Sequence, residues 1–229
     1  MAVKMKVLEF ANKVSRKKMG SKAGIKSTDP EYMILEPVVT DDMADVAMHL
    51  EFRNPLSAKE VAIRSVRPIS EVEKILWELA VDGVCFVNKI DGEDKYWYDT
   101  WVPGIMEMMT NNKENVKNHP QIAEAFEAYG RVRGAASAGM FPVGIGLMRV
   151  IPIESAIDGN SRRASYEEVS KYLNEHDIFS VSDCSCRTAR ESMGEGCGHL
   201  KEDMCIQMGH AAEYYIRTGR GREITREEA

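Results

Sequence analysis

Apolar residues recur at helical spacing between Pro68 and Gly83. Val72, Ile75 and Leu79 follow the i, i+3, i+7 pattern of a helix that buries one face. Gly83 ends the pattern, as glycine commonly does after the last turn of a helix. The segment therefore predicts an amphipathic helix whose apolar face contributes to a core.

Two shorter helices are predicted before this one, and a β-hairpin is predicted after it. The first helix follows from apolar spacing over residues 43–50, and the second from a serine and a glutamate at capping-box spacing before residues 58–65. Residues 84–90 and 95–101 are predicted strands, joined across the polar turn 91–94. Three helices followed by a hairpin predict a winged-helix-like domain.

The second half of the chain carries a different pattern. A strand is predicted over residues 147–153, a helix over residues 165–175, and a second strand over residues 178–182 that leads directly into Cys184. A strand, helix and strand in this order predict a small α/β unit.

Four of the five cysteines follow this unit in a C-x-C-x10-C-x7-C array. Cys184, Cys186, Cys197 and Cys205 supply four thiolates from one short segment, a ligand set that suits an iron–sulfur cluster or tetrahedral zinc. Structural zinc sites usually present paired C-x2-4-C knuckles, so the spacing favours a [4Fe-4S] cluster. The alternatives are a zinc site, two disulfides, or four unrelated thiols. Cys85, remote from the array, is predicted to be a small core side chain.

The residues around the array add to the predicted site. Gly196 and Gly198 flank the third cysteine, where a backbone without side chains can bring its N–H groups close to sulfur atoms. Arg187 adds positive charge beside the first two cysteines. Apolar spacing after Cys205 predicts a helix from Asp203 to Gly219, with its positive N-terminal end beside the cluster.

These residues resemble a known family. The motifs C-x-C-R, G-x-G-C, A-A-E-Y-Y-I and T-G-R-G-R-x-I-x-x-E-E-A, together with G-L-M-R-V-I-P-I-E further upstream, are similar to those of bacterial and archaeal 4Fe-4S-binding proteins. The similarity covers most of the chain. The resemblance implies a winged-helix-like domain before a four-cysteine region, and an association with flavin oxidoreductases or a dicluster ferredoxin domain. The C-x2-C-x2-C repeats of such a ferredoxin domain are absent from this sequence.

The predicted fold class is α+β, with an N-terminal winged-helix-like domain followed by a small α/β iron–sulfur domain. Residues 1–39 form a basic arm and linker, residues 40–110 the winged-helix-like domain, and residues 111–229 a helical connector with the cysteine-cluster domain. Residues 1–27 carry eight lysines and arginines against Glu9. They predict a solvated arm or a helix packed on the body, with docking on an acidic partner as the alternative.

The charge of the winged-helix-like domain opposes nucleic-acid binding, because affinity for DNA comes mainly from cationic contacts to phosphate. The third helix carries one cation, Lys74, and Arg64 and Arg67 lie in and beside the turn that precedes it. The acidic residues of the same helix and the wing are Glu71, Glu73, Glu78, Asp82, Asp91, Glu93 and Asp94. A protein–protein or scaffolding role is therefore favoured over a nucleic-acid one.

The predicted function is one-electron transfer through the cluster, as a module of a larger redox complex with a flavin- or ferredoxin-containing partner. We expect no substrate site in the chain itself. The alternatives are a cluster-containing winged-helix transcriptional regulator and a zinc-stabilised interaction module. With a net charge of −6, no apolar run long enough for a membrane span and no secretion signal, the chain is predicted to be cytoplasmic, and it could form an oligomer.

The last residues carry one more signal. Thr225 and Glu228 have capping-box spacing, which predicts a helix that begins at Arg226, where four residues remain. Because one helical turn has no independent stability, the sequence predicts either a fragment of a longer chain or a disordered tail.

Overall fold

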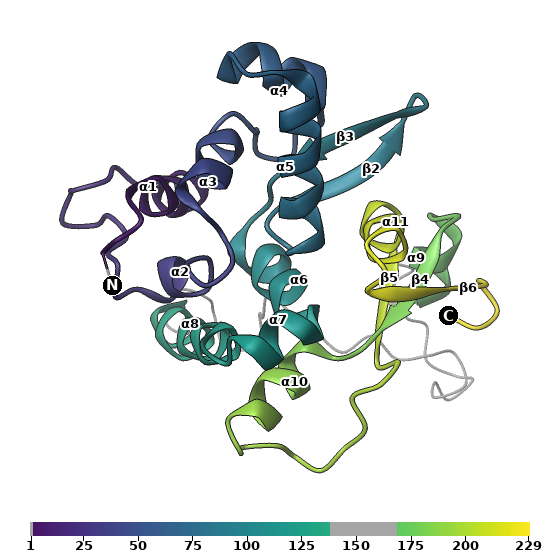
Figure 1. Cartoon of the computed structure of the whole chain (residues 1–229). Coiled ribbons are helices and arrows are strands. Elements are labelled where there is room, and N and C mark those ends of the chain that lie inside the picture. The colour runs from purple at the N-terminus through teal and green to yellow at the C-terminus, as the bar shows by residue number, and fades with distance from the viewer. Residues whose placement is uncertain (1, 138–168) are drawn as a thin grey trace.

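The computed structural model describes residues 2–137 and 169–229, and the fold is α+β, as predicted. The first part runs in the order α1 (Met5–Val14), α2 (Pro30–Met33), α3 (Asp41–Ala47), β1 (Leu56–Ser57), α4 (Ala58–Ser65), α5 (Ile69–Val81), β2 (Phe86–Ile90), β3 (Glu93–Trp97), a kinked segment (Trp101–Ile105), α6 (Met106–Asn111), α7 (Lys113–Asn118) and α8 (Gln121–Ser137) (Figure 1). The second part contains α9 (Val169–Asn174), β4 (Phe179–Ser182), α10 (Ser185–Ser192), β5 (Cys205–Met208), α11 (His210–Arg217) and β6 (Gly221–Ile224).

The first sheet is antiparallel and has the strand order β1-β3-β2. Tyr96 of β3 pairs with Val87 on one side and with Leu56 on the other. The hairpin is tighter than predicted, because Ile90 already pairs with Glu93 across the turn. The strand β3 therefore begins two residues earlier than the sequence pattern indicated.

The two helices between β1 and β2 have the bounds that the sequence predicts. Ser57 and Glu60 form the capping box at the start of α4: the Glu60 N–H donates to Ser57 Oγ (3.2 Å) and the Ser57 N–H donates to Glu60 Oε2 (2.7 Å). At the end of α5, Gly83 has φ +88°, and a Cβ there would lie 2.5 Å from the backbone of Met108. Glycine therefore both ends α5 and allows α6 to pack closely against it.

The basic N-terminal segment forms a packed helix. Val7 and Phe10 of α1 are fully buried, and α1 lies against α3. Lys13 donates from Nζ to the carbonyl oxygens of Met48 (2.5 Å) and Leu50 (2.6 Å), which follow the C-terminal end of α3. A cation at this position satisfies carbonyl groups that a helix leaves unpaired.

The segment from 29 to 39, which the sequence predicts to be an extended linker, contains α2 instead. Pro30 occupies the first turn of this helix, a position where proline is well tolerated because its missing N–H has no partner to lose. Helix α2 lies against α8 and α1, so the linker prediction is wrong for these residues.

The second sheet is also antiparallel, with β4 in the centre and β5 and β6 on either side. The strand predicted over residues 147–153 and the start of the predicted helix at 165 lie outside the described residues. The helix predicted from Asp203 to Gly219 is confirmed only in its second half, as α11. Its predicted start is wrong: Cys205–Met208 form β5, and α11 begins at His210 after Gly209, which has φ +59°.

The second sheet is joined to the first part by buried contacts of α11 and α10. Tyr214 of α11 is fully buried and donates its hydroxyl to the Ala80 carbonyl in α5 (2.8 Å), while Ser185 of α10 donates to the Glu107 carbonyl in α6 (2.9 Å). Ala189 and Tyr215 belong to the same buried cluster as the core of the first part. Among the helices of residues 2–137 and 169–229, none has the length and apolarity to cross a membrane.

Candidate functional site

Three of the four cysteines of the array lie at one end of the second sheet. Cys205 begins β5 and pairs with Ser182, the last residue of β4. Two residues further along, the backbone N–H of Cys184 donates to the Lys201 carbonyl (2.8 Å), and Cys184 is the N-cap of α10. Cys186 lies in the first turn of that helix. The thiol of Cys184 lies within hydrogen-bonding reach of the Cys186 and Cys205 thiols.

Burial affects the protonation of two of these thiols, Cys186 and Cys205. Burial raises the pKa of the Cys205 thiol to about 12, and the neighbouring Cys184 adds to the shift. Burial likewise raises the pKa of the Cys186 thiol, again with a contribution from Cys184. Both thiols are therefore protonated at neutral pH in the metal-free protein.

The fourth cysteine, Cys197, lies on the loop between α10 and β5. Its side chain is exposed and lines a cavity of about 250 Å³ together with Gly196, Gly198 and Arg187. Arg187 donates from Nη1 to the carbonyl of Leu200 within the loop. The three residues predicted to surround the cluster, Arg187, Gly196 and Gly198, therefore line the same cavity as Cys197.

The [4Fe-4S] assignment made from the spacing is wrong for this structure. Within residues 2–137 and 169–229, no group of three or more histidine, cysteine, aspartate or glutamate side chains is placed to hold a metal ion. Within the described residues, neither the thiols near the end of the sheet nor the exposed Cys197 on the loop belongs to such a group. The same finding applies to the zinc alternative. All five cysteines are free, so the disulfide alternative is also not realised.

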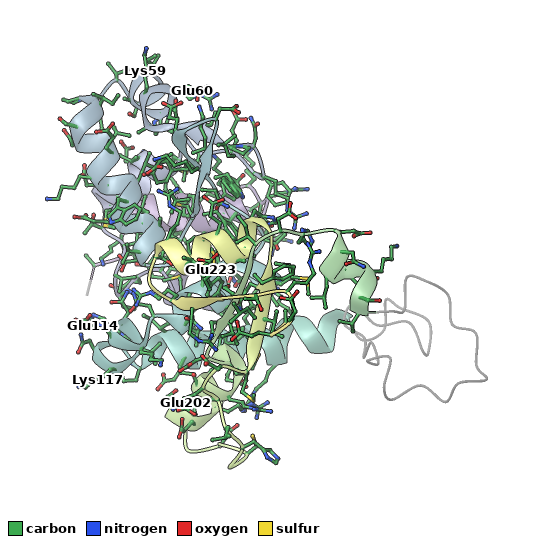
Figure 2. All side chains as sticks on the ribbon, turned by 90° about the vertical axis from the view of Figure 1, so that its right-hand side faces the viewer. Lys59, Glu60, Glu114, Lys117, Glu202 and Glu223 are labelled. Atoms are coloured by element: carbon green, nitrogen blue, oxygen red, sulfur yellow. The ribbon has the colours of Figure 1, made fainter. Side chains whose placement is uncertain are left out.

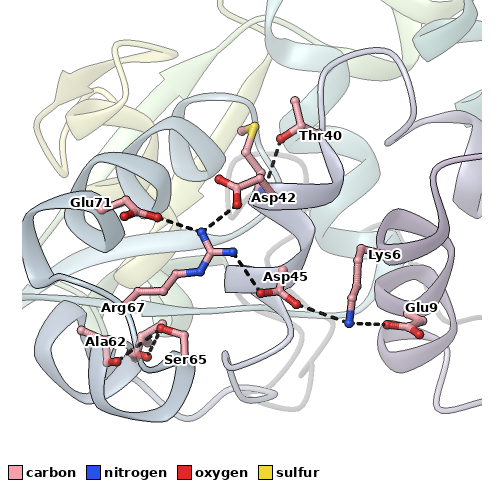
Figure 3. Close-up of polar contacts among 11 residues, drawn as sticks. Lys6, Glu9, Thr40, Asp42, Asp45, Ala62, Ser65, Arg67 and Glu71 are labelled. Atoms are coloured by element: carbon pink, nitrogen blue, oxygen red, sulfur yellow. Dashed lines mark hydrogen bonds and ion pairs between the residues drawn. The ribbon is translucent and has the colours of Figure 1, made fainter.

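Arg64 and Arg67 form ion pairs within the protein. They are the cations that lie in and beside the turn before α5, the helix that would approach DNA. Arg67 donates from Nη1 to Asp42 (2.7 Å) and Glu71 (2.8 Å) and from Nη2 to Asp45 (3.1 Å), as Figure 3 shows. Arg64 pairs with Glu51 at 2.5 Å. Both guanidinium groups already contact carboxylates, which competes with contact to phosphate.

The same region exposes large apolar side chains that the sequence pattern did not single out. Ile63 in α4 is 70% exposed, Val66 at its C-cap 90%, and Ile69 and Trp77 of α5 are 45% and 39% exposed. Ile63 falls outside the buried positions of α4, and this break in the apolar pattern is the sequence signal that could have identified it.

In Figure 2, Glu60 of α4 and Glu202 of the loop between α10 and β5 lie at opposite ends of the molecule.

Comparison with family models, with curated proteins and with solved structures finds no match for the chain. The resemblance to 4Fe-4S-binding proteins therefore rests on the sequence motifs alone. Electron transfer with a flavin- or ferredoxin-containing partner stays a prediction. The geometry of the α4–α5 surface, defined by Ile63, Val66, Ile69 and Trp77, offers an independent basis for a functional proposal.

Proposed function

We propose that the chain is a protein-docking module whose N-terminal unit binds a basic, apolar surface of a partner protein through the α4–α5 surface. The observation that carries the proposal is Val66, the most exposed of the large apolar side chains among the described residues. Its backbone has φ 56° and ψ 44°, the left-handed conformation. A β-branched residue is strained there, and glycine is the usual residue at the end of a helix.

The backbone strain and the exposure of Val66 both indicate a site of protein interaction. Neither is offset by a contact of the side chain with the folded chain, since nine-tenths of Val66 is exposed. Backbone strain of this kind clusters at sites of function, where a partner can compensate for it. Ile63, Val66 and Ile69 lie in and beside the turn between α4 and α5, and exposed apolar patches are a common feature of protein interaction sites.

The charge around this surface specifies the partner's chemistry. Glu73 and Glu78 are exposed on α5, where Lys74 lies 3.9 Å from Glu78, while Glu71 is already paired with Arg67. An acidic face repels phosphate and attracts a cationic surface. The occupant we propose is therefore a protein segment that combines apolar side chains with lysine or arginine.

The order of elements supports a winged-helix-like unit. Helix α3, strand β1, helices α4 and α5 and the β2–β3 hairpin follow one another as in a winged helix, and the strand order β1-β3-β2 agrees with that arrangement. The hairpin is engaged within the chain: Asn88 donates to Glu213 of α11 (2.8 Å), and Arg217 donates to Asp94 (2.8 Å). The wing is engaged by α11, whereas the α4–α5 surface is exposed in the part of the chain that the structure describes.

The proposal is compatible with the redox partner that the motifs imply. The α4–α5 surface itself indicates only that the partner's surface is basic and apolar. The cysteines are free, which favours a reducing compartment such as the cytoplasm.

The experiment compares two labelled probes by fluorescence anisotropy at low ionic strength: an amphipathic helical peptide of leucine and lysine, and a DNA duplex. We expect the peptide to bind more tightly than the duplex, and more tightly than a peptide in which glutamate replaces lysine. The double variant Ile63→Ser with Val66→Ser should weaken peptide binding by about tenfold or more, equivalent to ~1.4 kcal/mol.

The matched control is Val132→Ser, because Val132 is an exposed apolar residue of α8, away from α4 and α5. This variant should bind the peptide as the unchanged protein does. Equal binding of the lysine and glutamate peptides, or equal weakening by the control, would overturn the proposal. Tight duplex binding with a steep salt dependence would instead support the winged-helix regulator.

A further inference from the structure

A second surface feature lies on a different side of the fold, between the C-terminal end of α1, helix α2, helix α8 and the segment after β3. It is a cavity of about 580 Å³, within the usual size range of small-molecule sites. Cationic, acidic and aromatic side chains line it together, among them Arg16, Lys17, Glu31, Trp101, Tyr129 and Arg133.

The acidic and basic groups of this cavity are held in place by a buried ion pair. The Glu31 side chain is 2% exposed, and Arg133 donates to its Oε1 from Nε (3.1 Å) and Nη2 (2.5 Å). Burial opposes the charge of Arg133, but the contact with Glu31 outweighs it and raises the pKa of the guanidinium. Among the described residues, none donates a hydrogen bond to the second oxygen of Glu31, Oε2.

Arg16 is the second fixed cation. It follows the C-cap of α1 with φ 52°, a conformation in which glycine is more usual. Its guanidinium lies over the ring of Phe52, 4.3 Å from the ring centroid. Stacking on an aromatic ring limits the motion of the side chain and leaves the edge of the guanidinium available for an anion.

The aromatic part of the lining presents carbon atoms to the cavity. Trp101 is 4% exposed, and its indole N–H donates to Ser15 Oγ (2.8 Å). Its one polar group is therefore already satisfied, and what remains is an apolar surface. Val102 and Phe52 extend this surface.

We propose that this cavity binds a small organic anion, a carboxylate or a phosphate monoester attached to an apolar or aromatic body. Arg16, Lys17 and Arg133 face a single carboxylate, Glu31, so the lining has excess positive charge. The anionic group of the ligand contacts Arg16 and Lys17, and its apolar body contacts Phe52 and Val102 of the same lining. Arginine suits both carboxylate and phosphate, because its N–H groups match the spacing of two oxygen atoms.

The test is isothermal titration of the full chain with four probes: phenyl phosphate, benzoate, benzyl alcohol and inorganic phosphate. We expect phenyl phosphate or benzoate to bind at least about tenfold more tightly than benzyl alcohol, which lacks the charge, and than inorganic phosphate, which lacks the ring. The stronger of the two anions identifies the ligand class. Binding of benzyl alcohol as tight as that of the anions, or no binding of either anion at millimolar concentration, would overturn the proposal.

Two variants tie the binding to this cavity. Arg16→Gln should weaken the better anion by about tenfold, since it removes an exposed cation without disturbing the core. Lys18→Gln is the matched control, because Lys18 is exposed, lies two residues away and is not part of the lining. Equal affinities in Arg16→Gln and the unchanged protein would contradict the assignment. The cavity is separate from the α4–α5 surface, so this result is independent of the docking proposal.

Discussion

Val66 is the residue at which the fold departs most clearly from what an isolated chain favours. A left-handed conformation brings the Cβ of an L-residue close to its own backbone, at a cost of about 1–2 kcal/mol, and only glycine avoids this. The side chain gains little from burial in return, since it is 90% exposed. A valine at this position is therefore a stability defect of the free protein.

We expect Val66→Gly to raise the free energy of unfolding by about 0.5–1 kcal/mol, measured by urea denaturation. The relief of strain exceeds the extra entropy that glycine gains in the unfolded chain. Val66→Ala is the control: alanine keeps a Cβ in the left-handed conformation, so its effect should be smaller. A lower stability of Val66→Gly would show that the valine side chain makes a stabilising contact, and would weaken the case for a partner.

At the scale of single elements, the sequence predicted the helices and the hairpin whose signals are local. Helix α5 follows from apolar spacing that continues over three turns, and α4 from the capping box of Ser57 and Glu60. Both signals concern residues within a few positions of one another, so a distant part of the chain has little influence on them. The α+β class followed from these elements together.

The segment after Cys205 shows why other elements were not predictable. Its apolar residues have helical spacing, but Cys205–Met208 pair with Phe179–Ser182 of β4, residues more than twenty positions away in the sequence. Four residues are too few for periodicity to distinguish a strand from a helical turn. The candidate site failed for a related reason: spacing gave the identity of four potential ligands, whereas the folded path of the chain determines whether their sulfur atoms converge. Among the described residues no such metal-holding group forms.

Arg67 links two elements, and its removal gives a prediction at this scale. It joins Asp42 and Asp45 of α3 to Glu71 of α5, and these contacts raise its own pKa (Figure 3). We expect Arg67→Met to lower the free energy of unfolding by about 1–2 kcal/mol at neutral pH, because it leaves three carboxylates close together. Chemical denaturation measures the change.

The pH dependence of this loss follows from Asp45. Burial alone would raise the pKa of this carboxyl, but hydrogen bonds from Arg67 and Lys6 outweigh it and lower the pKa. A carboxyl whose pKa is lowered in the folded state contributes stability above its unfolded value of about 3.9, and this contribution disappears as the pH falls through the folded value. The difference between Arg67→Met and the unchanged protein should therefore shrink below about pH 4.

Lys74→Met provides the control for Arg67→Met. Lys74 is 78% exposed at its side chain and has a single ion-pair distance of 3.9 Å, to Glu78. Its replacement should change the free energy of unfolding by no more than about 0.5 kcal/mol. Equal effects of the two variants would show that Arg67 is an ordinary surface cation and not a link between α3 and α5.

For the whole molecule, the main buried cluster joins the second sheet to the first part. Tyr214 and Tyr215 of α11 and Ala189 of α10 belong to the same cluster as the core around α5 and β2. The second sheet has a small buried cluster of its own, formed by Phe179, Val181 and Ile224. Because so small a cluster supplies little apolar burial, the sheet depends on its contact with the larger core.

This dependence predicts a single unfolding transition. The chain's three tryptophans, Trp77, Trp97 and Trp101, all lie in the first part, so tryptophan fluorescence reports its unfolding. The NMR signals of the backbone amides of β4, the central strand, report the unfolding of the second sheet. In urea the two probes should give the same midpoint. Tyr214→Ala should lower both midpoints together, because it removes a buried ring and the hydrogen bond to Ala80. Loss of the native β4 amide signals at urea concentrations where the fluorescence is still native would show instead that the second sheet unfolds by itself, and that the contact through α11 does not unite the two parts.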